Sequence, residues 1–149
     1  MDKFYIIIIV LCAIALIIVI AGIVFYRKKK RFTKEYDLME GREFEYFCAD
    51  LLVKRGFLEV EVTKGSGDNG VDILAEKDGI TYAIQCKRYE EPVGVRAVQE
   101  AYAGRDYYDR MVGVVMSNQY FTKNAVEMAR KLKIMLWDRG YLEEMIEEE

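Results

Sequence analysis

Asp72, Gln85 and Lys87 are the residues of this 149-residue sequence whose types and spacing could most readily do chemistry. A carboxylate and an amide oxygen side by side are hard oxygen ligands suited to Mg²⁺, which keeps several of its waters. A lysine within reach of such an ion could orient or deprotonate a water, or neutralise charge that develops on a phosphate. The simpler interpretation is a surface Asp–Lys pair on a hairpin, worth ~0–1 kcal/mol.

These three residues belong to a predicted β-hairpin that would hold them together. Two strand-like runs, 71–76 and 80–88, flank Asp78-Gly79, a dipeptide typical of two-residue hairpin turns. Such a turn places Asp72 opposite Gln85. Because side chains alternate along a strand, all three polar residues then share one side of the sheet. The other side would be core, formed by Val71, Ile73 and Ala75 with Tyr82, Ile84 and Cys86.

A further carboxylate is expected from a helix predicted over 38–55. Its apolar residues recur at helical spacing: Phe44, Phe47, Cys48, Leu51 and Leu52. Glu45 lies about 100° from Phe44 on the helical wheel, at the margin of the apolar stripe, whereas Glu43 and Asp50 lie on the far side. Glu45 is therefore the acidic residue of this helix best placed to face the domain interior. The alternative is a surface glutamate.

Two more polar residues form a second tier of candidates. The loop 65–70 leads into the hairpin, and its glycines could permit tight turns and close approach of a phosphate, with Gly70 leaving space beside Lys87. An ordinary connecting loop is an equal alternative. Asp68 could hydrogen-bond within this loop or support a metal site. Gln99, on the next predicted helix, could position the lysine or a phosphate, or could be an exposed helix residue.

Several kinds of site are excluded by composition. The chain has no histidine, which excludes a Ser-His-Asp triad, a Cys-His dyad and the usual zinc sites. Cys12, Cys48 and Cys86 form no Cys-x-x-Cys motif, and their odd number agrees with a reducing compartment. We interpret all three as small buried hydrophobic residues.

The 52% hydrophobic content is unevenly distributed along the chain. Residues 4–26 form one apolar run interrupted only by Gly22, which is typical of a transmembrane helix. An uninterrupted basic block follows at 27–31, and the positive-inside bias would keep it in the cytoplasm together with the C-terminal domain. A cleaved signal peptide fits less well, because the run is too long and lacks a small-x-small site before the basic block. Residues 32–37 are interpreted as a linker and 38–149 as one domain.

The domain shows an α-β-β-β-α-β-α-β-α order of predicted elements. Antiparallel strands come first and β-α-β crossovers follow, which predicts a mixed sheet flanked by helices. Ser117 and Asn118 end the fourth strand near the expected path of a substrate, and Thr122 is a candidate helix cap. The predicted strands are 58–63, 71–76, 80–88, 112–116 and 134–137, and the helices are 38–55, 95–108, 122–132 and 141–148.

The sequence resembles the catalytic domain of Mrr-type restriction endonucleases, members of the PD-(D/E)XK nuclease superfamily. The resemblance covers about 38–146 and is carried by GREFEYFCADLLVKRGF, VTKGSGDNGVDILAEKDG, YAIQCKRYEEPVGVRAVQE and GVVMSNQYFTKNAVEMA. It implies that Asp72 binds a metal, that Lys87 is the catalytic lysine and that Glu45 approaches the metal from its helix. Gln85 stands where the wider superfamily has an acidic residue, so a neutral ligand is expected there.

The expected function is a membrane-anchored endonuclease that hydrolyses DNA with Mg²⁺, or with Mn²⁺ in its place. The alternative is a catalytically inactive nuclease fold that serves as a membrane-tethered interaction module. RNA is a second possible substrate, and a homodimer is a possible assembly. The net charge is +5 over 1–31 and −8 over the remainder, which weakens the case for tight nonspecific DNA binding. A local cationic rim could still form from Lys64, Arg88, Arg96, Arg105 and Lys123.

Overall fold

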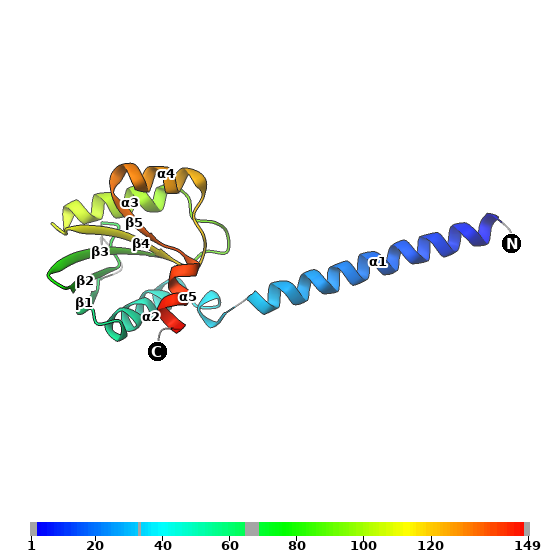
Figure 1. The fold of residues 1–149 in the computed structure, drawn as a ribbon, viewed down its shortest axis with the longest axis horizontal. Helices are drawn as coiled ribbons and strands as arrows, with labels where there is room; N and C mark the ends of the chain where they lie inside the picture. The colour runs from blue at the N-terminus through cyan, green and yellow to red at the C-terminus, as the bar shows by residue number, and fades with distance from the viewer. Residues whose placement is uncertain (1–2, 33, 65–68, 148–149) are drawn as a thin grey trace. The chain divides into compact units, whose positions relative to one another are not determined.

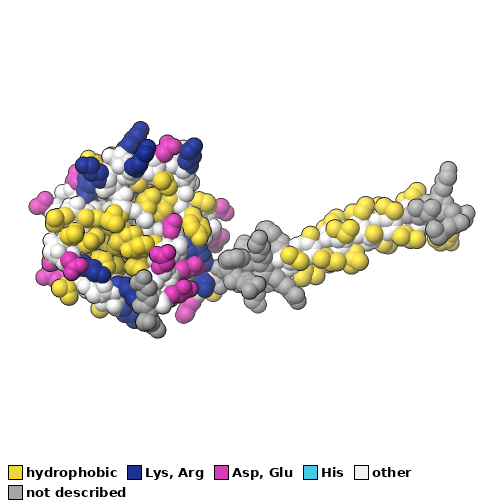
Figure 2. Space-filling model, viewed as in Figure 1, with side chains coloured by type: hydrophobic (Ala, Val, Ile, Leu, Met, Phe, Trp, Pro, Cys, Tyr) yellow, Lys and Arg dark blue, Asp and Glu magenta, His cyan; other side chains and the backbone are white. Residues whose placement is uncertain are grey.

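The computed structural model describes residues 3–32, 34–64 and 69–147, and it divides into two units, 1–34 and 35–149. The first unit contains helix α1 (Lys3–Phe32). The window Ile7–Val24 of this helix has a mean hydropathy of 3.5, and none of it is buried within the structure. Hydrophobic side chains cover the middle of the helix, the part that Figure 2 draws in colour. This helix is long and apolar enough to cross a membrane.

The second unit is built on a five-stranded sheet with the order β1-β2-β3-β4-β5. The pairs β1–β2 and β2–β3 are antiparallel, whereas β3–β4 and β4–β5 are parallel. This arrangement confirms the predicted mixed sheet. The strands are β1 (Leu58–Val62), β2 (Ile73–Lys77), β3 (Ile80–Lys87), β4 (Val112–Ser117) and β5 (Ile134–Trp137).

Two helices cover each face of this sheet (Figure 1). Helices α2 (Gly41–Lys54) and α5 (Arg139–Glu147) pack on one face, over a core that includes Phe44 and Trp137. Helices α3 (Val95–Tyr107) and α4 (Lys123–Leu132) pack on the other face. Thr122 caps α4 as predicted, because its side chain accepts a hydrogen bond of 3.2 Å from the amide of Ala125.

The hairpin between β2 and β3 has the predicted two-residue turn. Lys77 pairs with Ile80, and Asp78 and Gly79 both have positive φ angles, of 55° and 76°. Both values belong to the type of turn that joins twisted antiparallel strands. The amide of Asp72 also donates to the carbonyl of Ile84 at 2.9 Å, although Ile84 is the register partner of Ile73, so the regular register ends at Ile73.

Val71 lies on the opposite face of the sheet from the one predicted. Ile73 is buried in the core beneath α2, as expected, but Val71 packs against Gly104 of α3 on the opposite face. The regular strand begins only at Ile73, and Gly70 has a φ of 79°. The alternation of side chains therefore breaks between Val71 and Ile73, where the amide of Asp72 bonds to the carbonyl of Ile84, the register partner of Ile73.

The folded domain begins earlier than the predicted boundary at 38. Residues Glu35–Asp37 form a 3-10 helix, η1, inside the expected linker. The ring of Tyr36 is buried and stacks on Phe47, with 5.9 Å between ring centroids. Tyr36 therefore belongs to the core, and 35–37 are part of the folded domain.

The first helix of the domain begins at Gly41, three residues after the predicted start at 38. Glu40 is its N-cap, and Glu40 and Glu43 form a reciprocal capping box with each other's backbone amides. This arrangement satisfies two amide groups that the first turn would otherwise leave without partners.

Candidate active site

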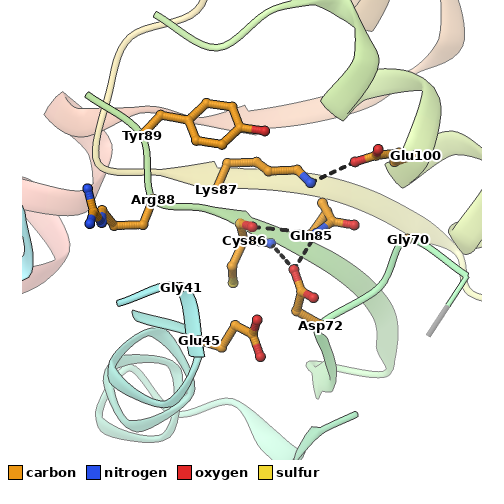
Figure 3. Close-up of a pocket in the computed structure, with 10 residues that line it drawn as sticks. All are labelled: Gly41, Glu45, Gly70, Asp72, Gln85, Cys86, Lys87, Arg88, Tyr89 and Glu100. Carbon is orange, nitrogen blue, oxygen red and sulfur yellow. Dashed lines mark hydrogen bonds and ion pairs between the residues drawn. The ribbon is translucent and has the colours of Figure 1, made fainter. Parts of the chain in front are cut away.

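Four of the predicted site residues line one pocket of about 420 Å³ (Figure 3). Glu45 reaches it from α2, Asp72 from the residues just before β2, and Gln85 and Lys87 from β3. The full lining is Gly41, Glu45, Gly70, Asp72, Gln85, Cys86, Lys87, Arg88, Tyr89 and Glu100.

Asp72 is held by two donors from β3. Its Oδ2 accepts a hydrogen bond of 2.6 Å from the backbone amide of Cys86 and another from Nε2 of Gln85. Asp72 and Gln85 are both only 5% exposed. Charge-assisted hydrogen bonds of this kind fix the carboxylate in one orientation. The expected carboxylate and amide are therefore in direct side-chain contact.

Gly70 brings the backbone unusually close to α3. A Cβ atom at this position would lie 2.7 Å from the carbonyl oxygen of Glu100, and the φ of 79° also favours glycine. Gly104 makes a matching approach, because a Cβ there would overlap the side chain of Val71. Glycine at position 70 thus allows the segment before Asp72 to pack on α3, which is a larger role than leaving space beside Lys87.

Lys87 is paired with a carboxylate that the sequence did not single out. Its Nζ lies 2.7 Å from Oε2 of Glu100, and Nε of Arg96 lies 3.0 Å from the other carboxylate oxygen. Burial alone would raise the pKa of Glu100, but its hydrogen bonds to the lysine and then to the arginine, with their charges, lower this pKa overall. Figure 3 shows Lys87 and Glu100 pointing toward each other across one wall of the pocket.

Glu45 lines the pocket as the helical wheel indicated, but it is also paired. Its Oε2 lies 2.6 Å from NH1 of Arg42, one turn earlier on α2. The side chain of Glu45 is 17% exposed and that of Arg42 is 41% exposed. The arginine therefore partly neutralises the acidic wall of the pocket from its solvent side.

The two second-tier candidates have different outcomes. Asp68 lies outside the described residues. Gln99 is exposed on α3 and does not line the pocket, and its neighbour Glu100 contacts Lys87 instead. One sequence feature could have drawn attention to Glu100: it follows Arg96 by four residues, a spacing at which the two side chains can form an ion pair along a helix.

The expected cationic rim is only partly assembled. Arg88 lines the pocket, and its Nε donates to the carbonyl of Met39 at 2.6 Å. Arg96 reaches the pocket wall through Glu100. Arg105 has a largely buried side chain, and it pairs with Asp106 next to it in sequence.

The donor set of this pocket fits a hard divalent cation. Among the described residues, no group of three or more His, Cys, Asp and Glu side chains is placed to hold a metal alone. Asp72 and Gln85 nevertheless put a carboxylate and an amide on one wall, with Glu45 in the same pocket. Mg²⁺ and Mn²⁺ accept oxygen ligands of this kind, and Mg²⁺ commonly keeps several waters beside one or two carboxylates. A half-turn of the Gln85 amide would present its oxygen in place of its nitrogen.

The fold and this pocket define a restriction-endonuclease-like domain. The chain belongs to the restriction endonuclease family with the Mrr-type catalytic domain, whose family model matches residues 36–146. This match confirms the resemblance seen in the sequence, and its start at 36 agrees with the folded boundary at η1.

Two solved structures share the fold. One is a protein of unknown function, AF1548, with 24% identity and a TM-score of 0.62 over 72% of this chain and 66% of that protein. The other is the DNA modification-dependent restriction endonuclease AspBHI, with 16% identity and a TM-score of 0.51 over 70% of this chain and 30% of that protein. This chain therefore spans only part of each neighbour. No curated protein matches it significantly.

Proposed function

We propose that this chain is a membrane-anchored, metal-dependent endonuclease that cleaves DNA phosphodiester bonds in the pocket between α2, β3 and α3. Its family supports a DNA endonuclease domain. The observation that carries the finer proposal is the meeting of Asp72, Gln85, Lys87 and Glu45 in one pocket, although they come from separate parts of the chain.

Each of these residues has a proposed role. Asp72 would be the anionic metal ligand, since its carboxylate is fixed by β3, and Gln85 would supply a neutral oxygen. Glu45 would approach the metal directly or through a water. The cation, Mg²⁺ or Mn²⁺, would supply charge stabilisation at the phosphate when bound.

Lys87 would act on the attacking water or on the phosphate. To do so, its ammonium group has to leave Glu100 at least in part, because the two groups lie 2.7 Å apart. A phosphate oxygen is a strong competing acceptor, so a bound substrate would replace Glu100 as the hydrogen-bond partner of the lysine. Glu100 would then hold the lysine beside the reacting group in the absence of substrate.

The proposal of a membrane anchor rests on α1 and on the basic block at the C-terminal end of this helix. The helix is long and apolar enough to span a bilayer, and the basic block at 27–31 favours a cytoplasmic domain.

The test is cleavage of supercoiled plasmid by the full-length protein in detergent. We expect nicked or linear product with Mg²⁺ or Mn²⁺ and none with EDTA. Folded RNA of similar length, assayed in parallel, should be cleaved far more slowly. Cleavage that persists unchanged in EDTA would contradict metal dependence.

One observation favours the alternative, a catalytically inactive interaction module. The pocket holds three carboxylates, Glu45, Asp72 and Glu100, against the cations Lys87 and Arg88. The residues after 31 also carry a net charge of −8, which opposes a polyanion. A protein that binds oligonucleotides yet leaves plasmid intact with either metal would support this alternative.

A further inference from the structure

Tyr89 is a pocket residue that the proposed metal chemistry does not use. It follows Lys87 by two residues and lines the same pocket, yet it is 45% exposed. Figure 3 shows its ring beside the Lys87 side chain, at the side of the pocket away from Glu45. A half-exposed aromatic ring is a poor core residue, because much of its apolar surface stays in water.

The backbone of Tyr89 is nevertheless fixed on both sides by one buried side chain. Its amide donates to Oδ1 of Asn118 at 2.9 Å, and its carbonyl accepts from Nδ2 of Asn118 at 3.0 Å. Asn118 is 1% exposed and stands immediately after β4. The side-chain amide of Asn118 thus makes the two backbone hydrogen bonds that a neighbouring strand would make to Tyr89, which lies beyond the end of β3.

Asn118 is itself held by an ion pair from the two ends of the domain. Its Nδ2 also donates to Oδ1 of Asp37 at 2.9 Å, and its carbonyl accepts from Arg139 at 3.0 Å. The guanidinium of Arg139 meets both carboxylate oxygens of Asp37 at 2.9 Å. Three other segments of the chain, at Asp37, Asn118 and Arg139, therefore converge to hold this half-exposed aromatic residue at the rim of the pocket.

We propose that Tyr89 stacks on an unpaired base next to the scissile phosphate, with Asn118 as its positioning residue. This proposal rests on the proposed nuclease function and narrows its substrate to DNA with a single-stranded segment at the cleavage site. A base within a duplex is covered on both faces by its neighbours, so a protein ring can stack only on a base that has left the duplex. Stacking of an aromatic side chain on a base is a common device for binding single strands.

The first experiment measures binding apart from cleavage. A fluorescein-labelled single-stranded oligonucleotide is titrated with the full-length protein in detergent, with Ca²⁺ in place of Mg²⁺, and fluorescence anisotropy is read. Tyr89→Leu should raise the Kd about tenfold, whereas Tyr89→Phe, which keeps the ring, should leave it nearly unchanged. The matched control is Tyr107→Leu, since Tyr107 is 66% exposed at the far end of α3.

The second experiment tests stacking itself. A series of oligonucleotides carries one abasic nucleotide at successive positions. At one position next to the cut, the abasic nucleotide should weaken wild-type binding about tenfold and leave the Tyr89→Leu variant unaffected. In the same assay, Asn118→Ala should weaken binding when Tyr89 is present and add little to Tyr89→Leu. The fluorescence of Trp137 checks that each variant is folded.

The results of these binding and cleavage assays distinguish failure of the stacking proposal from failure of the nuclease proposal. If neither plasmid nor single-stranded DNA is cleaved but Tyr89→Leu weakens oligonucleotide binding as described, the nuclease assignment fails and the stacking contact stands. If the wild-type protein cleaves DNA but a folded Tyr89→Leu variant binds and cleaves single strands as well as the wild type does, the stacking proposal is overturned. Equal or tighter binding of the matched duplex, or no binding of either form, would overturn it as well.

Discussion

At the scale of single residues, the contact between Lys87 and Glu100 most strongly affects the proposed chemistry. The lysine is the group expected to act on water or phosphate, and the glutamate is its partner in the structure. An ammonium group without any partner would not be held in place, and one bonded permanently to Glu100 could not reach the phosphate. A partner on α3 that can be exchanged for a phosphate oxygen holds the ammonium group within reach of the site.

The first prediction concerns the pH dependence of this ion pair. A carboxyl group whose pKa is lowered in the folded state contributes stability above its unfolded pKa, and this contribution is lost as pH falls through the folded-state pKa. Glu100→Gln should therefore unfold more easily than wild type at neutral pH, by about 1 kcal/mol or less because the pair is partly solvated. The difference should close in acid.

Urea unfolding followed by the fluorescence of Trp137, the only tryptophan of the chain, measures this effect. Trp137 is buried in the core of the domain, so the signal reports the domain alone. Glu127→Gln, at an exposed position on α4, is the control and should show no such change. A stability difference that is the same at neutral and acid pH would contradict the assigned role of the Glu100 carboxylate.

The sequence identified most of these residues, and the exceptions have a physical cause. The two-residue turn fixes the hairpin register from Lys77–Ile80 to Ile73–Ile84, and Asp72, Gln85 and Lys87 lie just beyond its last pair. Glu100 was missed in favour of Gln99, because neighbouring helix residues differ in direction by about 100° and the packing angle of α3 decides which one reaches β3. Sequence pattern does not reveal that angle.

Two other residues show what sequence pattern does predict. Cys48 and Cys86 are buried, as expected for small hydrophobic residues, whereas Cys12 on α1 is exposed, because none of the apolar window of this helix is buried within the described chain. Contact with Cys48 and then burial raise the pKa of the Cys86 thiol. Cys86 therefore stays protonated although it lines the pocket, and it is a poor nucleophile.

At the scale of elements, the approach of the segment before β2 to α3 shapes the site. Gly70 and Gly104 allow this contact, and it places Asp72 against β3. The register of the hairpin could be predicted because it depends on local turn geometry. The side taken by Val71 could not, because it depends on a contact with a helix more than thirty residues later in the chain.

The second prediction compares two glycines with similar backbone angles. Gly70 and Gly79 have φ values of 79° and 76°, but a Cβ atom meets Glu100 only at position 70 and has open space at 79. Gly79→Ala should cost about 1 kcal/mol from backbone strain alone, and Gly70→Ala should cost about 2 kcal/mol more. Trp137 fluorescence in urea gives both values. Equal costs for the two variants would contradict the close packing on α3.

The third prediction concerns the start of the domain. Asp37 and Arg139 form a largely buried ion pair, with side chains 12% and 11% exposed. Asp37→Ala should destabilise the domain by about 3 kcal/mol, because it leaves the arginine without its main partner. Glu35→Ala changes an exposed residue of the same 3-10 helix and should have little effect. If the two variants are equally stable, residues 35–37 are a linker after all.

At the scale of the whole molecule, charge and hydropathy divide the chain into two unlike parts. The apolar helix with its basic block is followed by an acidic domain. This division could be read from the sequence alone, since it depends on composition over long segments. The acidic domain also implies that the proposed DNA binding would depend on a few local contacts and on the proposed cation.

The fourth prediction tests the orientation of the anchor. A reporter fused after Glu149 should be inaccessible from outside intact cells, whereas a tag placed before Met1 should be accessible. The basic block at 27–31 gives the reason, because such blocks remain on the cytoplasmic side. The reverse pattern of accessibility would contradict the proposed location, and a soluble, shortened product would indicate a cleaved signal sequence.

The most direct test of the central proposal is plasmid cleavage by matched site and surface variants of the full-length protein. With Mg²⁺, Asp72→Ala and Lys87→Ala should each lower the cleavage rate at least about a hundredfold, because each removes a group proposed to act at the reacting phosphate. Asp50→Ala and Lys131→Ala change exposed residues of α2 and α4 and should cleave like wild type. If all four variants cleave at the wild-type rate, or if the wild-type protein leaves the plasmid intact, the proposed nuclease site is wrong.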